Sequence, residues 1–461
     1  MRAIGVCVAV AAVLAMAPAA RAAGTWTVQS ANAGKGVGLT CAVDESKAFA
    51  MGAVDDGQGN SVPVLLTTTN GGDAWTVGPL EGPVAGATVF LSDAACGTNG
   101  KCWAMGMSVG QTSGGGFDIR SRLISSSDGG KTWFWPQLQW IGKDWMFGKL
   151  DLVSDNDMWL SNGAVVIVHS TDGGATFKAW KEPKLSATEK FNSIADTAFL
   201  DDQTGFVVNS KSTVDENTKV ETIEAAGAFV KTTDGGATWT ALFTGRAEAY
   251  DRLEMKDANH GWLQGHTTSG IFLRRTRDGG QNWEDVAIPA PTGVDAITSI
   301  DGLWLFDAET GLMVGNTKVG ENAYTHAIYE IRNGVLSEVL PDPLEHNGSV
   351  GWISCTPQRT CWIGTGNPQV LKYEEEVVAP PEETATGADE ASVVERDEDA
   401  TAPSDTVAAD TTTPKDAVVG TDTGDKKDGG GCTAGALPGA SAAIPVLAGL
   451  FAWAIARRRR P

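Results

Sequence analysis

The segment "TTDGGATWTAL", Thr232 to Leu242, decides the fold, because close copies of it recur along the chain. Each copy begins with Ser or Thr, has Asp or Asn at the third position and Gly at the fifth, and carries an aromatic residue at the eighth. The other copies start at Thr68, Ser126, Ser170 and Thr276. Self-similarity of this kind is typical of repeat architectures.

The residue types of the phrase predict a local structural role. A third-position carboxylate or amide oxygen can accept hydrogen bonds from backbone N–H groups of its own turn. The fifth-position Gly permits positive φ, and the aromatic ring covers the turn and is buried against a sheet. Taken copy by copy, these residues are Asn70, Gly72 and Trp75; Asp128, Gly130 and Trp133; Asp172, Gly174 and Phe177; Asp234, Gly236 and Trp239; and Asp278, Gly280 and Trp283.

A second phrase, an aromatic or large apolar residue, two more residues and then Gly or Asn, marks the period, with Thr at the last position of the seventh copy. It begins at Phe49, Trp103, Trp159, Phe206, Trp262, Leu312 and Trp362, at steps of 47 to 56 residues. Each unit contains short alternating segments separated by Asp, Asn and Gly turns, which predicts about four strands per unit. Seven such units predict an all-β, seven-bladed β-propeller over residues 24–373. Rings of six or eight blades are the alternatives.

The chain end supports a closed ring. "GTWTVQS", from Gly24, is similar to the last strand of a unit, whereas the seventh unit ends after "QVLKYEE" without one. We therefore expect residues 25–29 to complete the seventh blade. The sixth unit keeps a hairpin at Asn333-Gly334 and lacks the repeated phrase.

The phrase resembles the Asp-box, or BNR repeat, of sialidases, sortilin-type receptors, some glycan hydrolases and photosystem II assembly-factor propellers. Seven units of this size look most like the photosystem II stability/assembly factor-like family. That resemblance implies a propeller that binds protein partners during assembly of a membrane complex. The family's binding patch is arginine-rich, whereas this body is acidic, so the resemblance is informative for the fold rather than for the ligand.

Both ends predict export. Residues 1–22 have a charged start, an apolar core and a small-x-small site, as in a secretory signal peptide; a retained membrane helix is the alternative. Residues 432–461 contain Cys432, an apolar stretch long enough for a transmembrane helix, and four arginines. This order resembles MYXO-CTERM surface-sorting tails, which implies processing near Cys432 by a sorting protease. A plain membrane anchor is the alternative.

An acidic segment, residues 374–431, joins the body to this tail. It contains 17 acidic and 4 basic residues and no aromatic residue, so we expect a disordered, extended stalk. The body itself has a net charge of −15. Nucleic acid is therefore not expected as a partner, because phosphate binding requires clustered Lys and Arg.

The cysteines of the body fit an oxidising compartment. "CGTNGKC" and "CTPQRTC" predict two local disulfides, Cys96–Cys102 and Cys355–Cys361, at equivalent places in two units. Cys41 matches the first position of these pairs, but Ala48 occupies the place of its partner. We expect Cys41 to be a buried free thiol.

Catalytic and metal signatures are weak. Sialidase-like chemistry requires an arginine cluster and a Tyr–Glu pair, and the body has only four tyrosines. A pair of catalytic carboxylates remains open, so a glycan-acting hydrolase, sialidase- or glucanase-like, is the alternative function. The histidines lack zinc-site spacing and are expected in exposed loops. No metal, no cofactor and no enzymatic activity are predicted.

The leading prediction is a monomeric binding or scaffold module on the cell surface, for protein or polysaccharide, anchored by its C-terminal tail in the membrane. The most distinctive segment outside the repeat is "FWPQLQWIGKDWMFGK", residues 134–149. Its aromatic residues Trp135, Trp140 and Trp145 are candidate binding residues. The alternative is that they pack between the second and third blades.

Overall fold

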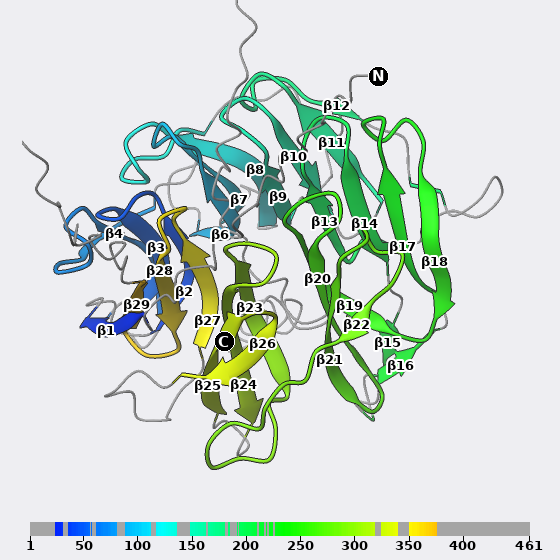
Figure 1. The fold of residues 1–461 in the computed structure, drawn as a ribbon. Coiled ribbons are helices and arrows are strands. Elements are labelled where there is room, and N and C mark those ends of the chain that lie inside the picture. Colours follow the sequence, from blue (N-terminus) through cyan, green and yellow to red (C-terminus); the bar gives the residue numbers. More distant parts are fainter. Residues whose placement is uncertain are drawn as a thin grey trace, which may run out of the picture. The chain divides into compact units, whose positions relative to one another are not determined.

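Seven antiparallel sheets surround a common centre in the computed structural model (Figure 1). The structure describes residues 24–30, 36–55, 57, 61–80, 88–111, 117–135, 148–162, 165–179, 183–184, 191, 193–209, 212–215, 218, 221–224, 226–318, 324–339 and 350–375. The prediction of an all-β seven-bladed propeller is confirmed. The predicted stalk beyond residue 375, the tail and the signal segment lie outside these ranges.

The blades, numbered 1 to 7 along the chain, share one strand order. The first strand of each blade lies nearest the centre, and first strands of successive blades contact one another around most of the ring. These strands are β2 (Val37–Ala42), β6 (Thr88–Cys96), β9 (Lys149–Leu152), β13 (Asp196–Phe199), β19 (Ala249–Met255), β23 (Ser299–Leu305) and β27 (Val350–Cys355).

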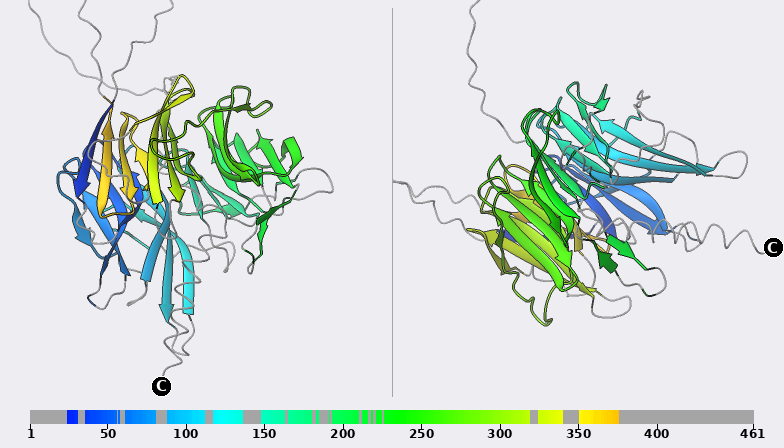
Figure 2. Two further views of the ribbon diagram at one scale, coloured as in Figure 1. Left: turned by 90° about the horizontal axis from the view of Figure 1, so that it is seen from below. Right: turned by 90° about the vertical axis from the view of Figure 1, so that its right-hand side faces the viewer.

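The second and third strands form the hairpin of each blade. The second strands are β3 (Ala48–Asp55), β7 (Cys102–Gln111), β10 (Met158–Ser161), β14 (Gly205–Asn209), β20 (Gly261–Thr267), β24 (Gly311–Lys318) and β28 (Thr360–Thr365). The third strands are β4 (Ser61–Thr68), β8 (Phe117–Ser126), β11 (Ile167–Ser170), β17 (Gly227–Thr232), β21 (Gly270–Thr276), β25 (Tyr324–Arg332) and β29 (Gln369–Glu374). The hairpin β7–β8, with ten residues in each strand, extends past its neighbours at one face of the ring (Figure 2).

Short outer strands complete the blades. They are β5 (Thr76–Gly78), β12 (Lys178–Ala179), β18 (Thr240–Arg246), β22 (Glu284–Asp285), β26 (Val335–Glu338) and β1 (Thr25–Ser30). Blade 2 has an isolated bridge between Ser125 and Phe134 in place of a fourth strand. Blade 4 carries an inserted hairpin, β15 (Ser212–Val214) with β16 (Glu221–Ile223), between its second and third strands.

The N-terminal strand closes the ring. β1 pairs antiparallel with β29, from Thr25 opposite Glu374 to Ser30 opposite Gln369. The rings of Trp26 and Tyr373, also opposite each other, have centroids 4.9 Å apart. Because β1 precedes all other blades in the chain and pairs with the last one, the ends of the ring are held by a full ladder of backbone hydrogen bonds.

The core lies between the blades. The large residue that opens the second phrase of each unit is almost completely buried on the second strand, at Phe49, Trp103, Trp159, Phe206, Trp262, Leu312 and Trp362. Two of these rings also reach the following blade. Trp103 Nε1 donates to the carbonyl of Gly173 at 3.1 Å, and Trp262 Nε1 donates to that of Ala308 at 3.3 Å.

The repeated phrase forms the turn that follows the third strand of its blade, and hydrogen bonds within the turn stabilise it. In the blade 2 copy, the hydroxyl of Ser126 donates to Asp128 Oδ1 at 2.7 Å and accepts the N–H of Gly130 at 2.9 Å. Asp128 Oδ1 also accepts the N–H of Thr132, and its Oδ2 accepts the Thr132 hydroxyl. The other four copies repeat the bonds of the first hydroxyl and the third-position oxygen. The two glycines of each copy have positive φ, between 66° and 91°.

The repeated turns also join neighbouring blades. A Cβ added at Gly130 would lie 2.4 Å from the ring of Phe49 in blade 1, so only Gly fits against that ring. Trp133 then meets the same Phe49 edge-on, with centroids 5.1 Å apart. Gly280 and Trp283 contact Phe229 of blade 4 in the same way. The phrase therefore shapes both a turn and the contact between two blades.

Both predicted disulfides, Cys96–Cys102 and Cys355–Cys361, are present. Each connects the first and second strands of its blade next to their turn. Cys41 is fully buried, and its Sγ lies 3.5 Å from the Sγ of Cys96. Cys41 of blade 1 therefore lies in direct contact with the Cys96–Cys102 disulfide of blade 2.

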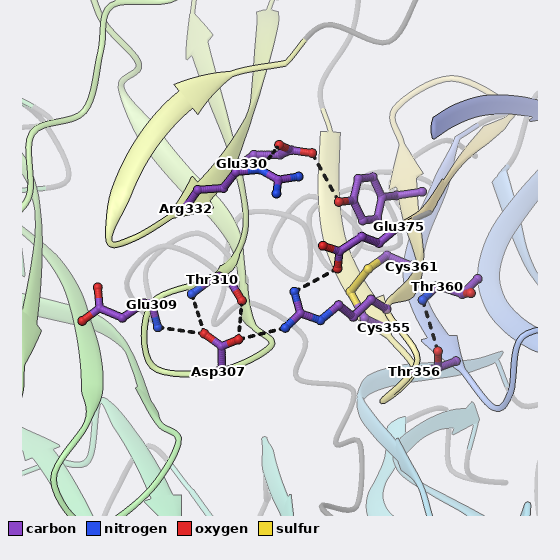
Figure 3. A network of polar contacts seen from close by, with 12 residues as sticks. Asp307, Glu309, Thr310, Glu330, Arg332, Cys355, Thr356, Thr360, Cys361 and Glu375 are labelled. Carbon is purple, nitrogen blue, oxygen red and sulfur yellow. Dashed lines mark hydrogen bonds and ion pairs between the residues drawn. A yellow bond between two sulfur atoms is a disulfide. The ribbon is translucent and has the colours of Figure 1, made fainter. Parts of the chain in front are cut away.

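A polar network joins blades 6 and 7 (Figure 3). Arg359, at φ 67°, donates to Asp307 Oδ2 at 2.8 Å and to Glu375 Oε2 at 2.9 Å. Tyr373 donates its hydroxyl to Glu330 Oε1, whose other oxygen accepts from Arg332. Glu374 belongs to β29 and Glu375 to this network, so the first two residues of the predicted stalk contact blade 7.

Candidate functional site

Charged side chains line the centre of the ring at equivalent positions. In blades 2 to 5, a backbone N–H closes the turn between the first and second strands, and the residue four positions before that N–H is charged. These residues are Asp93, Lys149, Asp196 and Arg252, so negative and positive charges alternate from blade to blade. Lys149 Nζ lies 3.2 Å from Asp196 Oδ1. Burial opposes the charge of Lys149, but the carboxylates around it outweigh burial and raise its pKa.

The two aspartates of this layer connect adjacent blades. Asp93 Oδ2 accepts the backbone N–H of Leu150 in blade 3 at 2.7 Å. Asp196 Oδ2 accepts the backbone N–H of Leu253 in blade 5 at 2.8 Å. Their Oδ1 atoms accept the N–H groups of Ala94 and Thr197. Both carboxylates are therefore occupied in holding first strands together.

Two more carboxyl groups lie two residues further along their strands. Asp151 Oδ2 accepts the hydroxyl of Thr197 at 2.7 Å, and its side chain is 11% exposed. Glu254 Oε1 accepts the backbone N–H of Leu305 in blade 6 at 2.8 Å. Glu254 Oε2 is buried and accepts no hydrogen bond from the described part of the chain. Burial raises the pKa of Asp151 to about 7 against the opposing charge of Lys149, and burial likewise raises the pKa of Glu254.

These two carboxyl groups line a cavity of about 210 Å³ that opens to solvent. Its walls come from the first strands of blades 3 to 6 and from Thr356 and Pro357 after β27. Phe199, Met255 and Trp304 contribute apolar surface, and Lys149 and Lys256 contribute positive charge. The cavity is chemically mixed, with an aromatic and aliphatic wall around protonatable oxygens.

A second polar cluster involves blades 5 and 6. Asp251 and Asp301 each sit at a β-bulge in a first strand, where the pairing register with the second strand shifts. His266 Nδ1 lies 2.9 Å from Asp251 Oδ2, and its Nε2 lies 3.1 Å from Glu221 Oε2 on the inserted hairpin. The hydrogen bond to Asp251 is the largest cause that raises the pKa of His266 to about 9. Burial raises the pKa of Asp301, and the negative charge of Asp251 adds to it.

The candidate residues of the aromatic segment are placed only in part. Trp135 packs against the core shared by blades 1 and 2 and lies over Gly106 of β7. For Trp135 alone, this contact differs from the alternative of packing between blades 2 and 3. Trp140 and Trp145 lie outside the described residues, as does Cys432.

The expectation that the histidines lie in exposed loops is wrong for His169 and His326. His169 and His326 are buried in strands β11 and β25. His169 stacks on Trp159 with centroids 3.8 Å apart and lies 2.7 Å from Asp157 Oδ1. Over the described ranges, no group of three or more His, Cys, Asp or Glu side chains is placed to hold a metal ion.

Sequence reasoning missed the charged layer, although a signal for it exists. The first strands of the units read "SDAAC", "KLDLV", "ADTAF" and "DRLEM", each with an ionisable residue inside an apolar segment. Aligning the units on the turn that follows would have superimposed Asp93, Lys149, Asp196 and Arg252. The alternation of charge at that one position then indicates a shared layer at the ring centre.

No protein-family model and no curated protein sequence matches the chain. Solved structures do. The structure titled "YCF48 bound to D1 peptide" is 12% identical with a TM-score of 0.51, over 76% of this chain and 97% of that one. YCF48 from Cyanidioschyzon merolae is 15% identical with a TM-score of 0.49, over 76% and 99%. A GH74 enzyme from Niastella koreensis is 12% identical with a TM-score of 0.35, over 72% and 64%. At 12% identity, the first of these similarities shows a shared fold alone. With TM-scores below 0.5, the other two are too weak for any structural or functional conclusion.

Within the described residues, no helix is long and apolar enough to cross a membrane.

Proposed function

We propose that this propeller is a non-enzymatic binding module for a protein partner, exported and held at the cell surface by its C-terminal tail. A binding role is favoured over a catalytic one because the central carboxylates hold neighbouring blades together. Asp93, Asp196 and Glu254 each accept a backbone N–H of the next blade, at 2.7 to 2.8 Å. Groups fixed in this way hold a rigid ring and are poor general acids or bases.

The fold suits this role, because rigid blades present loops around a central channel while the ligand is chosen by the loops. YCF48, which shares the fold, is seen bound to a peptide, and that is a precedent for a protein partner on this scaffold. Polysaccharide is the other surface ligand that we expect.

Binding is tested with the purified protein on two arrays, one of envelope proteins from the source cell and one of its surface polysaccharides. We expect saturable binding to a protein and no new reducing ends from any polysaccharide. Turnover of a polysaccharide would overturn the non-enzymatic assignment.

Anchoring is tested on intact cells that express either the natural chain or Cys432→Ala. External protease should release the propeller of the natural chain from the cell surface. If the tail is processed near Cys432, the variant should keep its C-terminal segment, which an antibody to the last residues detects. Protection of the natural chain from external protease would contradict surface display.

A glycan-acting hydrolase is the second candidate, because of one specific observation. Asp301 has a raised pKa, whereas the neighbouring Asp251 pairs with His266, and two carboxyl groups in different environments are the usual acid and base of glycoside hydrolysis. Release of reducing ends that disappears in both Asp301→Asn and Asp251→Asn would support this candidate. Release that persists in both variants would contradict it.

A further inference from the structure

We propose that the cavity bordered by Asp151 and Glu254 binds an alkylammonium group, the chemistry of a lysine side chain. The proposal rests on the proposed protein-binding function for its biological meaning, since a lysine of the partner would supply the group.

Carboxyl groups outnumber cations around the cavity. The two neighbouring layers of the first strands contain the carboxyl groups of Asp93, Asp151, Asp196 and Glu254 and the cations Lys149 and Arg252, and Lys256 adds a third cation at the cavity wall. Lys149 lies 3.2 Å from Asp196 and 4.0 Å from Asp151. The set therefore has one carboxyl group more than it has cations.

Burial favours the uncharged form of the two carboxyl groups that line the cavity. It raises the pKa of Asp151 to about 7 and also raises the pKa of Glu254. An ammonium group entering the cavity would favour the ionised form of the carboxyl group beside it.

Glu254 lines the cavity and has an acceptor atom without a donor. Its Oε2 is buried and receives no hydrogen bond from any described residue. A buried carboxylate oxygen without a donor is costly, and a ligand that brings N–H groups relieves that cost. Glu254 Oε1 is held by Leu305, so Oε2 is fixed in direction before the ligand arrives.

The wall of the cavity suits an alkyl chain. Phe199, Met255, Trp304 and Phe306 line it together with Pro357, which gives an apolar surface for a chain of methylene groups. Lys256 is the one positive charge of the wall with no ion pair to a described residue, and it opposes a second cation. The net charge of −15 on the body attracts cations from a distance.

The test uses calorimetry on the intact protein at pH 7 with n-butylammonium as the probe and 1-butanol as its uncharged match. We expect butylammonium to bind and butanol not to bind. Binding should release protons, detected as a dependence of the heat on the ionisation enthalpy of the buffer, because the ligand displaces a proton from Asp151 or Glu254. A second arm compares the peptide Gly-Lys-Gly with Gly-norleucine-Gly and distinguishes a lysine side chain from a free amine.

Variants assign the effect. Asp151→Asn and Glu254→Gln keep the shape of the side chains, and each should weaken butylammonium binding about tenfold or more. Lys256→Met should strengthen it. Asp285→Asn, which changes an exposed carboxyl group on β22 that does not line the cavity, should leave the affinity within about twofold.

Two outcomes would overturn the inference: no binding of butylammonium, or binding that Asp151→Asn and Glu254→Gln leave unchanged. If Glu254→Gln lowers stability through the Leu305 contact, Asp151→Asn still decides the case. A protein partner captured by a protein that fails to bind amines would end this inference and leave the proposed function intact. Amine binding without any protein partner would do the reverse.

Discussion

The hydroxyl of Ser126, the first residue of the blade 2 copy of the repeated phrase, stabilises its turn. Ser126 is buried, donates to Asp128 and accepts from the N–H of Gly130. Ser126→Ala leaves that N–H without an acceptor, so we expect the free energy of unfolding to fall by about 1–3 kcal/mol. Urea denaturation measures the change.

The matched control is Thr132→Ala in the same turn. Thr132 is exposed, and its hydroxyl donates to Asp128 Oδ2, whereas the hydrogen bond from its backbone N–H to Asp128 Oδ1 is kept in the variant. We expect a loss below about 1 kcal/mol. Equal losses in the two variants would mean that the buried N–H of Gly130 has found another acceptor.

Arg359 of blade 7 links this blade to blade 6 through a charged hydrogen bond to Asp307. Its side chain is 15% exposed and bridges Asp307 and Glu375. Arg359→Ala removes both hydrogen-bonded pairs, and we expect a loss of about 2 kcal/mol, measured by urea denaturation. Arg359→Lys keeps the charge but loses the planar fork, so it should recover only part of the loss. Full stability in the Ala variant would show that the network contributes nothing.

At the scale of elements, His266 connects the inserted hairpin β15–β16 to blade 5. Its pKa is raised from 6.5 to about 9, because Asp251 and Glu221 favour the protonated ring. A raised pKa means that the stabilisation is complete below pH 6.5 and is lost as the pH rises through 9, with an upper limit of about 3 kcal/mol.

We therefore expect the free energy of unfolding to decrease between pH 6.5 and pH 10, more in the natural chain than in His266→Gln. Urea denaturation across this range tests the prediction. Parallel pH profiles for the two proteins would contradict it, because the difference between them isolates the titration of this histidine.

The two disulfides belong to the same scale, since each closes the turn between a first and a second strand. Cys355→Ala with Cys361→Ala should lower the free energy of unfolding by about 2 kcal/mol, a modest amount because the closed loop is short. Urea denaturation measures the loss. Peptide mapping without reductant should recover Cys96–Cys102 and Cys355–Cys361 as pairs from the natural chain.

At the scale of the whole molecule, stability depends on closing the ring. Deleting residues 25–30 removes β1 and exposes the edge of β29. We expect the deleted protein to aggregate and to lose cooperative unfolding, because a free sheet edge pairs with other chains. Light scattering and thermal denaturation follow both effects.

A peptide with the sequence "GTWTVQS" supplied in trans should restore part of the monomer. A scrambled peptide of the same composition is the control, since it lacks the order that places Trp26 against Tyr373. A deleted protein that stays monomeric and unfolds like the natural chain would show that blade 7 is complete without β1.

The sequence by itself determined the number of blades, the position of the repeated turns and the two disulfides. These features are local: a Ser or Thr, an Asp, two glycines and a short Cys spacing meet their partners within a few residues. The closing strand was also predictable, because the seventh unit lacks what residues 25–29 provide.

Only the tertiary structure decided what lies at the centre of the ring. Asp93 and Leu150, or Glu254 and Leu305, are more than fifty residues apart, and their contact exists only once the ring is closed. The raised pKa of Asp151 and the unused oxygen of Glu254 arise from burial and from the charges of other blades, which no local pattern records. The repeated phrase therefore determines the propeller fold. Contacts between charged groups of different blades, far apart in the sequence, create the candidate site at its centre.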